Sequence, residues 1–431
     1  MLKNFKGYQL NEIETSVTEF INKEKFTLMY LKETVFFPES AGQISDKGVI
    51  IFNKKEYKVL GLAISEDKVV HKVELIKDIK VGSQVIAKLD KNHRDLVSQN
   101  HSAAHLLFDT LREIFPTSIG KGYFNDESGL RMDMYIEQKI SWSNIYELNN
   151  IVKQKMTTNA KKEEFIVDAK TAIEKYNLAI EFNQKQLEGD LRIVKFDNAS
   201  IQLCSGTHVN SLKDIEDFLI TSYESKGSGV YRFYAKTKNF EINLAYNSFC
   251  ETEFKEVEQL ILKYSNLKKH GKDDNVEMML SAWVHLTKKY SKQKETSWQD
   301  YIKFKSLATD LKIQIPDFLN EIDSKKKDLL YKKYKDISPT SSLDYNLFLI
   351  EESFLENKDL NFIADLILKN NSNAFVEVFD LTSKIYLCKS NSKINALEKM
   401  LNHLTFEIKG GGNDKTAQGK IIIKSFNAPL N

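Results

Sequence analysis

Two short stretches, about a hundred residues apart, carry side chains of the kinds that bind metal ions, and they constrain the fold more than any other feature. The first is NHSAAHLL, with His101 and His105, and the second is CSGTH, with Cys204 and His208. Residues four apart on a helix project from one face about one turn apart, so both histidines can offer nitrogens to one ion. If the second stretch completes the set, a helix and a strand-turn that are distant in sequence must meet.

The local patterns predict which elements carry these side chains. A helix is predicted from about residue 95 to residue 115, because apolar residues recur at helical spacing and Pro116 stops the run. The recurring residues are Ala104, Leu107, Leu111 and Ile114. Cys204 ends a predicted strand, SIQLC (200–204), and Gly206 permits a tight turn that returns His208 toward it.

Three imidazoles and one thiolate form a ligand set that suits zinc best, with tetrahedral geometry. A closed set of four protein ligands is typical of a structural ion, whereas an exchangeable ligand allows catalysis, and the pattern does not decide between them. The alternative is that these are core histidines with satisfied hydrogen bonds and a small buried cysteine. With only 3 Cys and 8 His in 431 residues, chance rarely produces both motifs.

The patterns change along the chain, which is too long for one compact core. The first 90 or so residues contain short β-rich runs separated by turn-type clusters, which favour a small antiparallel barrel or sandwich. These runs are FTLMYLKETVFF (26–37), GVIIFN (48–53) and YKVLGLAIS (57–65). A mixed α+β segment follows, in which DFLITSYES and VYRFYAKT flank Gly227-Ser228-Gly229 as a predicted hairpin.

Charged helices are predicted from about residue 244 to residue 335, and the last 90 residues alternate between strand and helix. KGGGNDKTAQG (409–419) is predicted as a polar loop before a final strand, KIIIKSF (420–426). The predicted fold class is therefore α+β and multidomain. Its expected domains are a small β-barrel (1–92), a zinc-bearing α+β domain (93–245), a helical connector (246–340) and a C-terminal α/β domain (341–431).

Composition excludes several classes of protein. The net charge is only +2, so no global field drives the chain onto nucleic acid, and any basic surface must be local. Three cysteines give no disulfide framework, which fits a reducing compartment. The N-terminus lacks the apolar core of a signal peptide, and no run of about 18 apolar residues occurs. The sequence therefore predicts a cytoplasmic protein that does not span a membrane.

Four further stretches accompany the two metal-type motifs. They are TVFFPESAGQISDKG (34–48), GLRMDM (129–134), SGVYRFYA (228–235) and GGGNDKTAQG (410–419). With HSAAHLL and CSGTH, the first three resemble stretches of alanyl-tRNA synthetase editing domains and of their free-standing relatives, the AlaX proteins. The last is similar to the Gly-rich Ala-Gln-Gly loop of the C-terminal domain that alanyl-tRNA synthetases share with DHH-type phosphoesterases. The resemblance covers about residues 27–240 and 370–425, in the family's order.

The resemblance implies an alanyl-tRNA editing protein of the long AlaX type. A full synthetase is not expected, because the chain begins at the editing barrel, and neither is a DHH phosphoesterase, because no Asp-His-His motif occurs. The implied activity is zinc-dependent hydrolysis of serine, and also glycine, from mischarged alanine tRNA. A synthetase pocket that accepts alanine cannot reject serine or glycine by a large factor, so a second site that hydrolyses the wrong ester is needed. The expected partner is that tRNA, but not DNA or a membrane, and the C-terminal domain is expected either to bind tRNA or to join a second copy of the chain.

The resemblance also implies roles for single residues. His101, His105, Cys204 and His208 are the expected ligands of Zn2+. Gln43, at the end of the glycine-rich loop, is expected to contact the aminoacyl end. Thr34 is expected on a barrel strand that faces this loop, where it helps to sense a serine hydroxyl; the alternative is an ordinary β-branched strand residue.

Other matched residues have expected structural roles. Asp46 and Gly48 are expected to shape a turn. Arg131 and Asp133 are expected to form an ion pair that braces the site, with a contact from Arg131 to the tRNA backbone as the alternative. The sequence departs from the family pattern at Ser40-Ala41 and at Ser205, where the family has glycines, which puts the fit of the substrate in question.

Two regions are candidates for contact with RNA. The Gly-rich loop offers open backbone N–H groups to a phosphate. Its candidate residues are Lys409, Gly410, Gly411, Gly412 and Gln418, with Lys415 beside them. The Lys-rich stretch at 325–335 suits phosphate contacts or, alternatively, forms a solvated helix face. Two rival functions stay open: a non-catalytic tRNA-binding protein with a structural zinc, and a deacylase for another aminoacyl-tRNA, since threonyl-tRNA synthetases carry a related domain.

Overall fold

The computed structural model describes residues 4–40, 42–176, 178, 189–267, 272–293, 297–342 and 344–422. The chain packs as two compact units, Met1–Gln259 with Met279–Asp310, and Leu260–Met278 with Leu311–Asn431. The boundary falls inside three helices, so each of them contributes residues to both units. The predicted domain limits at residues 92, 245 and 340 stay predictions.

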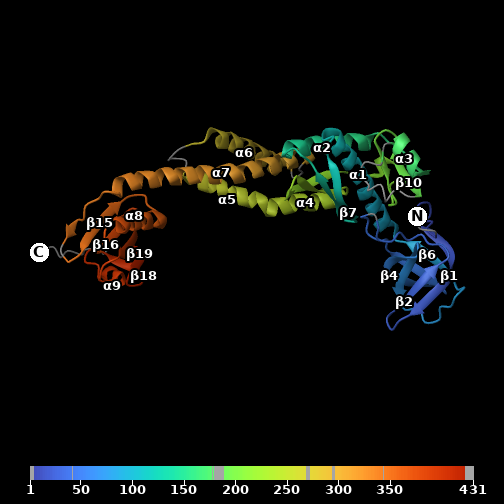
Figure 1. Cartoon of the computed structure of the whole chain (residues 1–431), viewed down its shortest axis with the longest axis horizontal. Helices are drawn as coiled ribbons and strands as arrows, with labels where there is room; N and C mark the ends of the chain where they lie inside the picture. The colour runs from blue at the N-terminus through green and yellow to red at the C-terminus, as the bar shows by residue number, and fades with distance from the viewer. Residues whose placement is uncertain are drawn as a thin grey trace. The chain divides into compact units, whose positions relative to one another are not determined.

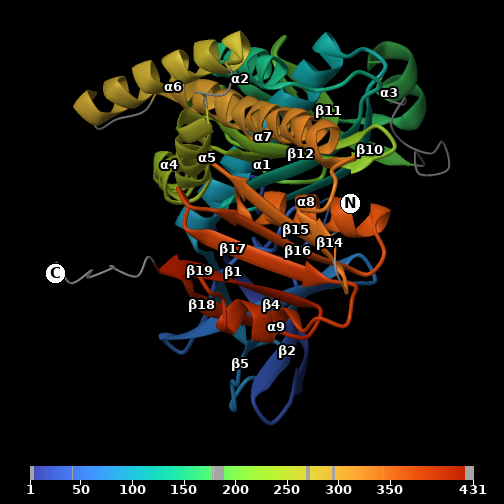
Figure 2. The ribbon, with the colours of Figure 1, turned by 90° about the vertical axis from the view of Figure 1, so that its left-hand side faces the viewer.

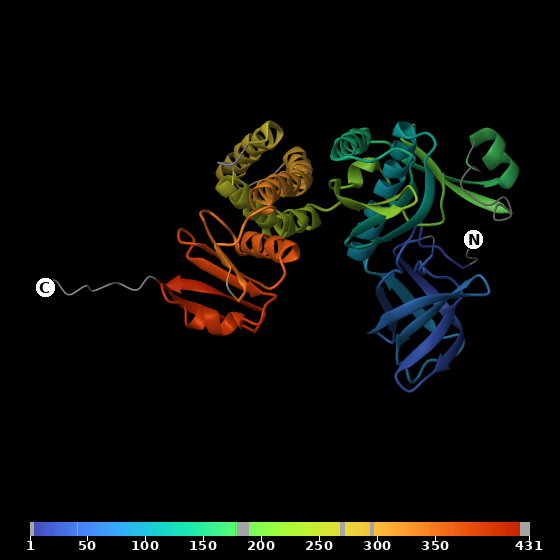
Figure 3. The same ribbon diagram turned by 60° about the vertical axis from the view of Figure 1, so that its left-hand side comes forward.

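Six strands close into the predicted N-terminal barrel, in the order β1-β2-β5-β4-β3-β6 (blue in Figures 1 and 3). The strands are β1 (Glu12–Asn22), β2 (Phe26–Leu31), β3 (Gly48–Phe52), β4 (Lys55–Ser65), β5 (Lys68–Glu74) and β6 (Gln84–Leu89). Every neighbouring pair is antiparallel. Inward residues alternate with outward ones, as in β2, where Met29 and Leu31 are fully buried in the core. The predicted first run is too long, because β2 ends at Leu31 and a loop follows.

The metal-motif region combines helices with two antiparallel sheets, ordered β12-β13-β8-β7 and β11-β10-β9. Its helices are α1 (Lys91–Ile114), α2 (Trp142–Thr157), α3 (Ala169–Tyr176) and the short 3₁₀ helix η3 (Leu212–Asp214). Its strands are β7 (Ile119–Asp126), β8 (Gly129–Tyr135), β9 (Lys162–Asp168), β10 (Asp190–Phe196), β11 (Ser200–Leu203), β12 (Leu219–Gly227) and β13 (Val230–Lys236). The predicted hairpin is confirmed as β12 and β13, whose turn residues Gly227, Ser228 and Gly229 all have positive φ.

Four helices form the predicted helical stretch: α4 (Asn239–Glu251), α5 (Glu253–Leu267), α6 (Asp274–Gln293) and α7 (Trp298–Tyr334). In the first unit α5, α6 and α7 meet through Phe254, Trp283 and Phe304, whose ring centroids lie 5.0 to 6.1 Å apart. None of the helices in the described residues combines the length and the apolar character that a membrane crossing requires.

The second unit contains a six-stranded sheet in the order β14-β15-β16-β17-β19-β18 (Figure 2). Its elements are β14 (Ser341–Ser342), β15 (Asn346–Glu352), α8 (Asn357–Asn370), β16 (Ala374–Asp380), β17 (Ile385–Ser390), α9 (Ala396–Leu401), β18 (Glu407–Gly412) and β19 (Thr416–Ile422). β15 and β16 are parallel and joined through α8, which fits the predicted α/β character. The Gly-rich stretch is not a loop, as predicted, but the hairpin of β18 and β19; residues 423–426 of the predicted final strand lie outside the described residues.

Candidate metal centre

Helix α1 carries the first two ligand-type side chains. Asp90 caps the helix by accepting a hydrogen bond from the N–H of His93, and no Gly or Pro interrupts it before Pro116. His101 and His105 lie one turn apart on its buried face, only 2% and 5% exposed, with ring centroids 5.2 Å apart. The helix therefore presents both imidazoles at one place inside the protein.

The second motif meets them. Cys204 directly follows β11, and its sulfur lies 3.2 Å from Nε2 of His101 and 3.4 Å from Nε2 of His208. The ligand atoms of Cys204 and the three histidines all lie within 4.8 Å of one another. Gly206 does not adopt a positive φ, so the predicted turn is not what requires glycine. Instead, a β-carbon there would lie 2.1 Å from Cε1 of His101, so no larger residue fits.

The cluster fits a tetrahedral ion. Bonds of about 2.1 Å to nitrogen and about 2.3 Å to sulfur put neighbouring ligand atoms about 3.4 to 3.6 Å apart. The sulfur-to-nitrogen separations of 3.2 and 3.4 Å are close to this spacing. Nδ1 of His105 is buried and has no hydrogen-bond partner within the described part of the chain, although buried polar atoms ordinarily have one. This orphaned nitrogen argues against satisfied core histidines.

Burial sets the protonation of the cluster. Removal from water lowers the pKa of His105 to about 3 and lowers the pKa of His101 and of His208 well below the ordinary value, with repulsion from neighbouring imidazoles adding to the effect on the last two. Removal from water raises the pKa of Cys204 to about 11. At neutral pH the imidazoles therefore keep free lone pairs, while the thiol keeps its proton until a cation displaces it.

Two side chains orient the imidazoles from outside the cluster. Oε1 of Gln43 lies 2.8 Å from Nδ1 of His101 and accepts a hydrogen bond from the N–H of Thr207 at 2.9 Å. Oγ of Ser102 lies 3.1 Å from Nδ1 of His208. These contacts engage the outer nitrogen of each ring and leave Nε2 facing the sulfur. Gln43 is fully buried, and its predicted contact with an aminoacyl end stays a prediction.

The loop around Gln43 forms despite the departures from the family pattern. Ser40 and Gln43 exchange backbone hydrogen bonds of 3.1 and 2.9 Å around a tight turn. Gly42 in this turn has φ +71, which favours glycine, while Ala41 lies outside the described residues. Gln43 then bridges to Asn125 of β7, so the loop runs beside the sheet. Ser40 in place of a glycine is therefore compatible with the contact between Gln43 and His101.

Thr34 does not lie on a barrel strand, contrary to the prediction. It follows the end of β2 and forms an isolated bridge with Phe5. Its hydroxyl lies 2.8 Å from Nε2 of His71, which is buried on β5, and accepts a hydrogen bond from the N–H of Phe36. The apolar run continues past β2 because its later residues are buried in a loop, not because they pair in the sheet. The predicted contact of Thr34 with a serine substrate stays a prediction.

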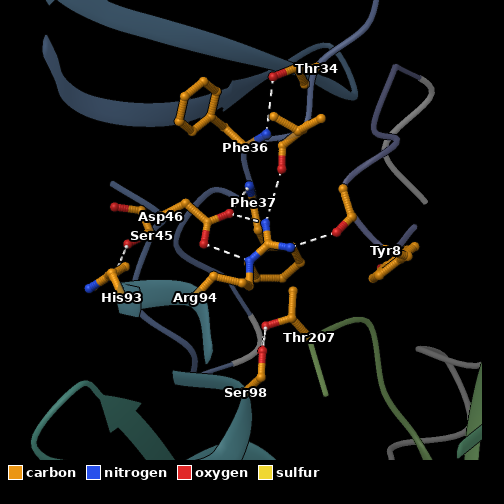
Figure 4. A network of polar contacts seen from close by, with 12 residues as sticks. Tyr8, Thr34, Phe36, Phe37, Ser45, Asp46, His93, Arg94, Ser98 and Thr207 are labelled. Carbon is orange, nitrogen blue, oxygen red and sulfur yellow. Dashed lines mark hydrogen bonds and ion pairs between the residues drawn. The ribbon is translucent and has the colours of Figure 1, made fainter. Parts of the chain in front are cut away.

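Arg94 of helix α1 binds to loops of the barrel region (Figure 4). Its Nε donates to Asp46 at 2.8 Å, its Nη2 donates to the other carboxylate oxygen, and further bonds reach the carbonyl oxygens of Gly7 and Val35 at 2.6 and 3.0 Å. Both charged side chains are buried, at 7% and 1% exposure, so each depends on the other. Asp46, predicted to shape a turn, does hold its loop, because its carboxylate accepts a hydrogen bond from the N–H of Phe37 at 2.5 Å, and it is also the counter-ion of Arg94. A β-carbon at Gly48 would lie 2.2 Å from a backbone oxygen of β6.

A cavity of about 300 Å³ opens beside His208. Its walls come from the N-terminal segment, from α1 and from the stretch that follows Cys204, and they include Tyr8, Lys91, Lys162 and Thr207. Most of these walls are polar. The cavity therefore adjoins one of the four residues of the cluster, His208.

The predicted ion pair between Arg131 and Asp133 is not formed. β8 and β13 pair so that Asp133 lies opposite Arg232, whose guanidinium donates two hydrogen bonds of 2.7 Å to its carboxylate. In an antiparallel pair the residue directly opposite is a closer neighbour than one two positions along the same strand. Arg131 instead lies over the ring of Phe124, 5.9 Å from its centroid, and its contact with tRNA stays a prediction.

The glycines of the C-terminal hairpin allow two strands to approach closely. A β-carbon on Gly410 would lie 1.9 Å from the carbonyl oxygen of Gln418, and one on Gly412 would lie 2.2 Å from another carbonyl oxygen of β19. At Gly411 a β-carbon would meet nothing within 4 Å. The predicted open loop is thus wrong, although Lys409, Gln418 and the glycines are exposed, and their part in tRNA binding stays a prediction.

The lysine-rich run on α7 is paired with carboxylates. Lys325 and Lys327 pair with acidic residues one turn earlier on the same helix, at 2.6 and 3.5 Å. Lys326 pairs with the buried Asp359 of α8 at 2.6 Å. These contacts favour the alternative that this run is a solvated helix face, whose lysines pair with nearby carboxylates.

Several residues that contact the cluster or its loop were not predicted from the sequence, among them Tyr8, Ser102, Arg192 and Thr207. Ser102 and Thr207 lie inside the two motifs, so their position was the one available signal. Tyr8 lies in the segment before the barrel and Arg192 on β10, and nothing in the local pattern singles them out.

The class of the protein follows from the barrel and the metal-type loop together. The family described as "tRNA synthetases class II (A)" matches residues 4–93, which include the barrel. The family described as "Threonyl and Alanyl tRNA synthetase second additional domain" matches residues 191–234, which include Cys204 and His208. These two stretches are therefore similar to parts of tRNA synthetases.

Individual relatives narrow this class. The chain is 32% identical over 438 residues to an alanine–tRNA ligase of Mesoplasma florum, a match that covers 97% of this chain and 46% of the relative. It is 29% identical to the alanine–tRNA ligase of Mycoplasma mycoides subsp. mycoides, a match that covers 95% of this chain and 46% of the relative. It is 30% identical to the alanine–tRNA ligase of Mesomycoplasma hyopneumoniae strain 7448, a match that covers 97% of this chain and 46% of the relative. The protein is therefore related to alanyl-tRNA synthetases, and it spans about half the length of the curated relatives it matches.

Proposed function

We propose that this chain hydrolyses the ester bond of mischarged alanine tRNA, releasing serine and also glycine. The observation that carries the proposal is the buried set of three imidazoles and one thiol beside a polar cavity. The relation to alanine–tRNA ligases over 95–97% of this chain supports alanine tRNA as the substrate. Action on free tRNA, as in a free-standing editing protein, and a cytoplasmic location belong to the same proposal.

In this proposal His101, His105, Cys204 and His208 hold Zn2+. The ion, when bound, supplies a Lewis acid that can orient the amino or hydroxyl group of the substrate or polarise a water molecule. The chain's own part is to keep the imidazoles neutral by burial and to aim them. Gln43 holds Nδ1 of His101, which fixes the ring before substrate arrives.

The cavity beside His208 is the proposed entry for the aminoacyl end. At about 300 Å³ it lies at the lower end of the usual size of ligand sites, which suits a small amino acid. Thr34 and Gln43 are the proposed contacts to that amino acid. Both side chains are fully buried outside the lining of this cavity, and the hydroxyl of Thr34 and the amide of Gln43 already have partners. A substrate would therefore reach them only if the intervening residues move and a hydrogen bond is exchanged.

The rival functions differ in what supports them. A family description that names both threonyl and alanyl synthetases leaves a threonine-type deacylase open, but the match with alanine–tRNA ligases extends through the C-terminal sheet. A closed set of four ligands is the feature that favours a structural zinc in a non-catalytic tRNA-binding protein. We propose that the C-terminal sheet binds tRNA or forms a homodimer in either case.

The test is deacylation of Ser-tRNA(Ala) by the zinc-loaded chain, with Ala-tRNA(Ala) as the control substrate. We expect loss of serine and retention of alanine, and we expect Cys204→Ala to abolish the reaction. Cys250→Ala is the matched control, because it removes a half-buried thiol of α4 and should leave the rate unchanged. A zinc-loaded protein that binds the tRNA and hydrolyses neither ester would overturn the proposal.

A further inference from the structure

Two side chains outside the sequence motifs contact the backbone of residues 204–208, which we call the metal loop. Nη1 of Arg192 donates to the carbonyl oxygens of Cys204 and Gly206, at 2.7 and 2.9 Å. The hydroxyl of Tyr8 donates to the carbonyl oxygen between them, that of Ser205, at 2.5 Å. Three consecutive carbonyl groups therefore face the same pair of side chains.

These two side chains also support each other. The guanidinium of Arg192 lies over the ring of Tyr8, 3.8 Å from its centroid. The other side of the guanidinium is held by Glu164 of β9, whose Oε2 lies 2.9 Å from Nη2 and 3.3 Å from Nε. The arginine side chain is only 4% exposed. A buried arginine fixed in this way on several sides has little freedom to change rotamer.

The direction of the carbonyl groups decides where the loop amides point. The N–H of Gly206 donates to the sulfur of Cys204 at 3.3 Å, and the N–H of Thr207 donates to Gln43 at 2.9 Å. Gln43 in turn lies against His101. Because the peptide groups are planar, holding the carbonyl groups of the loop also fixes its N–H groups. These N–H groups contact the sulfur of Cys204 and the side chain of Gln43, which lies against His101.

We propose that Arg192 and Tyr8 are positioning residues that preform the metal loop, so that Cys204 and His208 stand in binding geometry before the ion arrives. The inference rests on the proposed function only in taking the cluster as a metal centre. Because Tyr8 precedes the barrel, the N-terminal segment takes part in metal retention. Preformed ligands spare the ion the cost of ordering the loop, which appears as affinity.

The experiment measures metal binding, not hydrolysis. Zinc affinity is measured by competition with a chelator, and Co2+ is bound as a spectroscopic probe, whose visible and sulfur-to-metal bands report the geometry of the ligands. Arg192→Met removes both carbonyl contacts. Arg192→Lys keeps the charge but loses the planar group that contacts Glu164 through Nε and Nη2 while Nη1 reaches the two carbonyl oxygens. Tyr8→Phe keeps the ring and removes one hydroxyl. Arg232→Met is the matched control, since it removes an arginine with a two-bond carboxylate partner from another sheet of the same unit.

We expect zinc affinity to fall by about 10- to 100-fold in Arg192→Met, less in Arg192→Lys and by up to about 10-fold in Tyr8→Phe, each with altered Co2+ bands. Arg232→Met should lower thermal stability without changing either readout. Wild-type affinity and Co2+ bands in a folded Arg192→Met would overturn the inference, and so would an unchanged Tyr8→Phe if Arg192→Met fails to fold. A wild-type protein that binds zinc tightly but hydrolyses no ester would contradict the proposed function and would leave this inference unaffected.

Discussion

Gln43 allows a sharp test of how the metal centre is assembled, because its one amide oxygen contacts both halves. That oxygen lies 2.8 Å from Nδ1 of His101, on the helix, and 2.9 Å from the N–H of Thr207, on the loop, at zero exposure. Replacing Gln43 by alanine removes the acceptor from two buried N–H groups at once. The imidazole of His101 is then free to turn, and the loop loses its tie to the helix.

The expected size of the effect follows from these contacts. A buried donor left without an acceptor costs about 1–3 kcal/mol, and a water molecule that enters the vacated space can satisfy one of the two. Loss of the partner of a metal-binding histidine lowers affinity by about 10- to 100-fold. At about 1.4 kcal/mol per tenfold this is about 1.4–2.8 kcal/mol, which agrees with one unsatisfied group. We therefore expect Gln43→Ala to bind zinc about 10- to 100-fold more weakly.

The assay is chelator competition for zinc at fixed pH, with Gln43→Glu and Gln99→Ala as companions. Gln43→Glu keeps an oxygen acceptor at the same reach and adds negative charge near the ion, so its affinity should equal or exceed that of the wild type. Gln99 also lies on α1, and its side-chain oxygen accepts a hydrogen bond from the backbone N–H of Glu216. Gln99→Ala removes that acceptor and should leave zinc affinity unchanged. Wild-type affinity in Gln43→Ala, or equal weakening by Gln43→Glu, would refute this account.

Three further predictions follow from other contacts. Asp46→Asn and Arg94→Met should each lower the free energy of unfolding by about 3–5 kcal/mol, and the double variant by less than the sum, in a double-mutant cycle by urea denaturation. Zinc affinity should rise about tenfold per pH unit between about pH 6 and 8, because burial raises the pKa of Cys204 to about 11 and each ion must displace the thiol proton. The histidines release no proton on binding, because their depressed pKa values leave them neutral over this range. A flat pH profile in chelator competition would contradict this prediction. Gly410→Ala should destabilise the C-terminal sheet by about 1–3 kcal/mol while Gly411→Ala changes its thermal unfolding little, because only the first β-carbon meets the neighbouring strand.

Local patterns in the sequence predicted the parts of the fold that depend on near neighbours. Three of the six barrel strands (β2, β3 and β4), the helix of the two histidines and the β12–β13 hairpin each follow from periodicity and turn residues within one segment. The other three barrel strands, β1, β5 and β6, were not predicted individually. The run that contains β2 was predicted too long because periodicity reports burial, and the residues after Leu31 are buried in a loop without pairing in the sheet. Glycine in the C-terminal stretch suggested a loop, whereas close approach of two strands is an equally good reason for glycine.

Contacts between distant segments could not be predicted in the same way. The partner of Asp133 depends on the register of β8 against β13, which places Arg232 opposite it and leaves Arg131 with an aromatic ring. The four side chains of the cluster could be predicted to meet because each motif is recognisable by residue type and spacing. The side chains that orient them are ordinary polar residues, and their roles exist only once the segments are packed together.

The proposed metal centre takes its ligand residues from one stretch of sequence and much of its geometry from another. All four proposed ligand residues lie between positions 101 and 208, yet the barrel region and the segment before it supply Gln43, Asp46 and Tyr8. Asp46 fixes the helix half of the centre through Arg94, Tyr8 fixes the loop half, and Gln43 joins the two. The predicted boundary at residue 92 separates the cluster from these three residues, so the geometry of the cluster depends on contacts that cross that boundary.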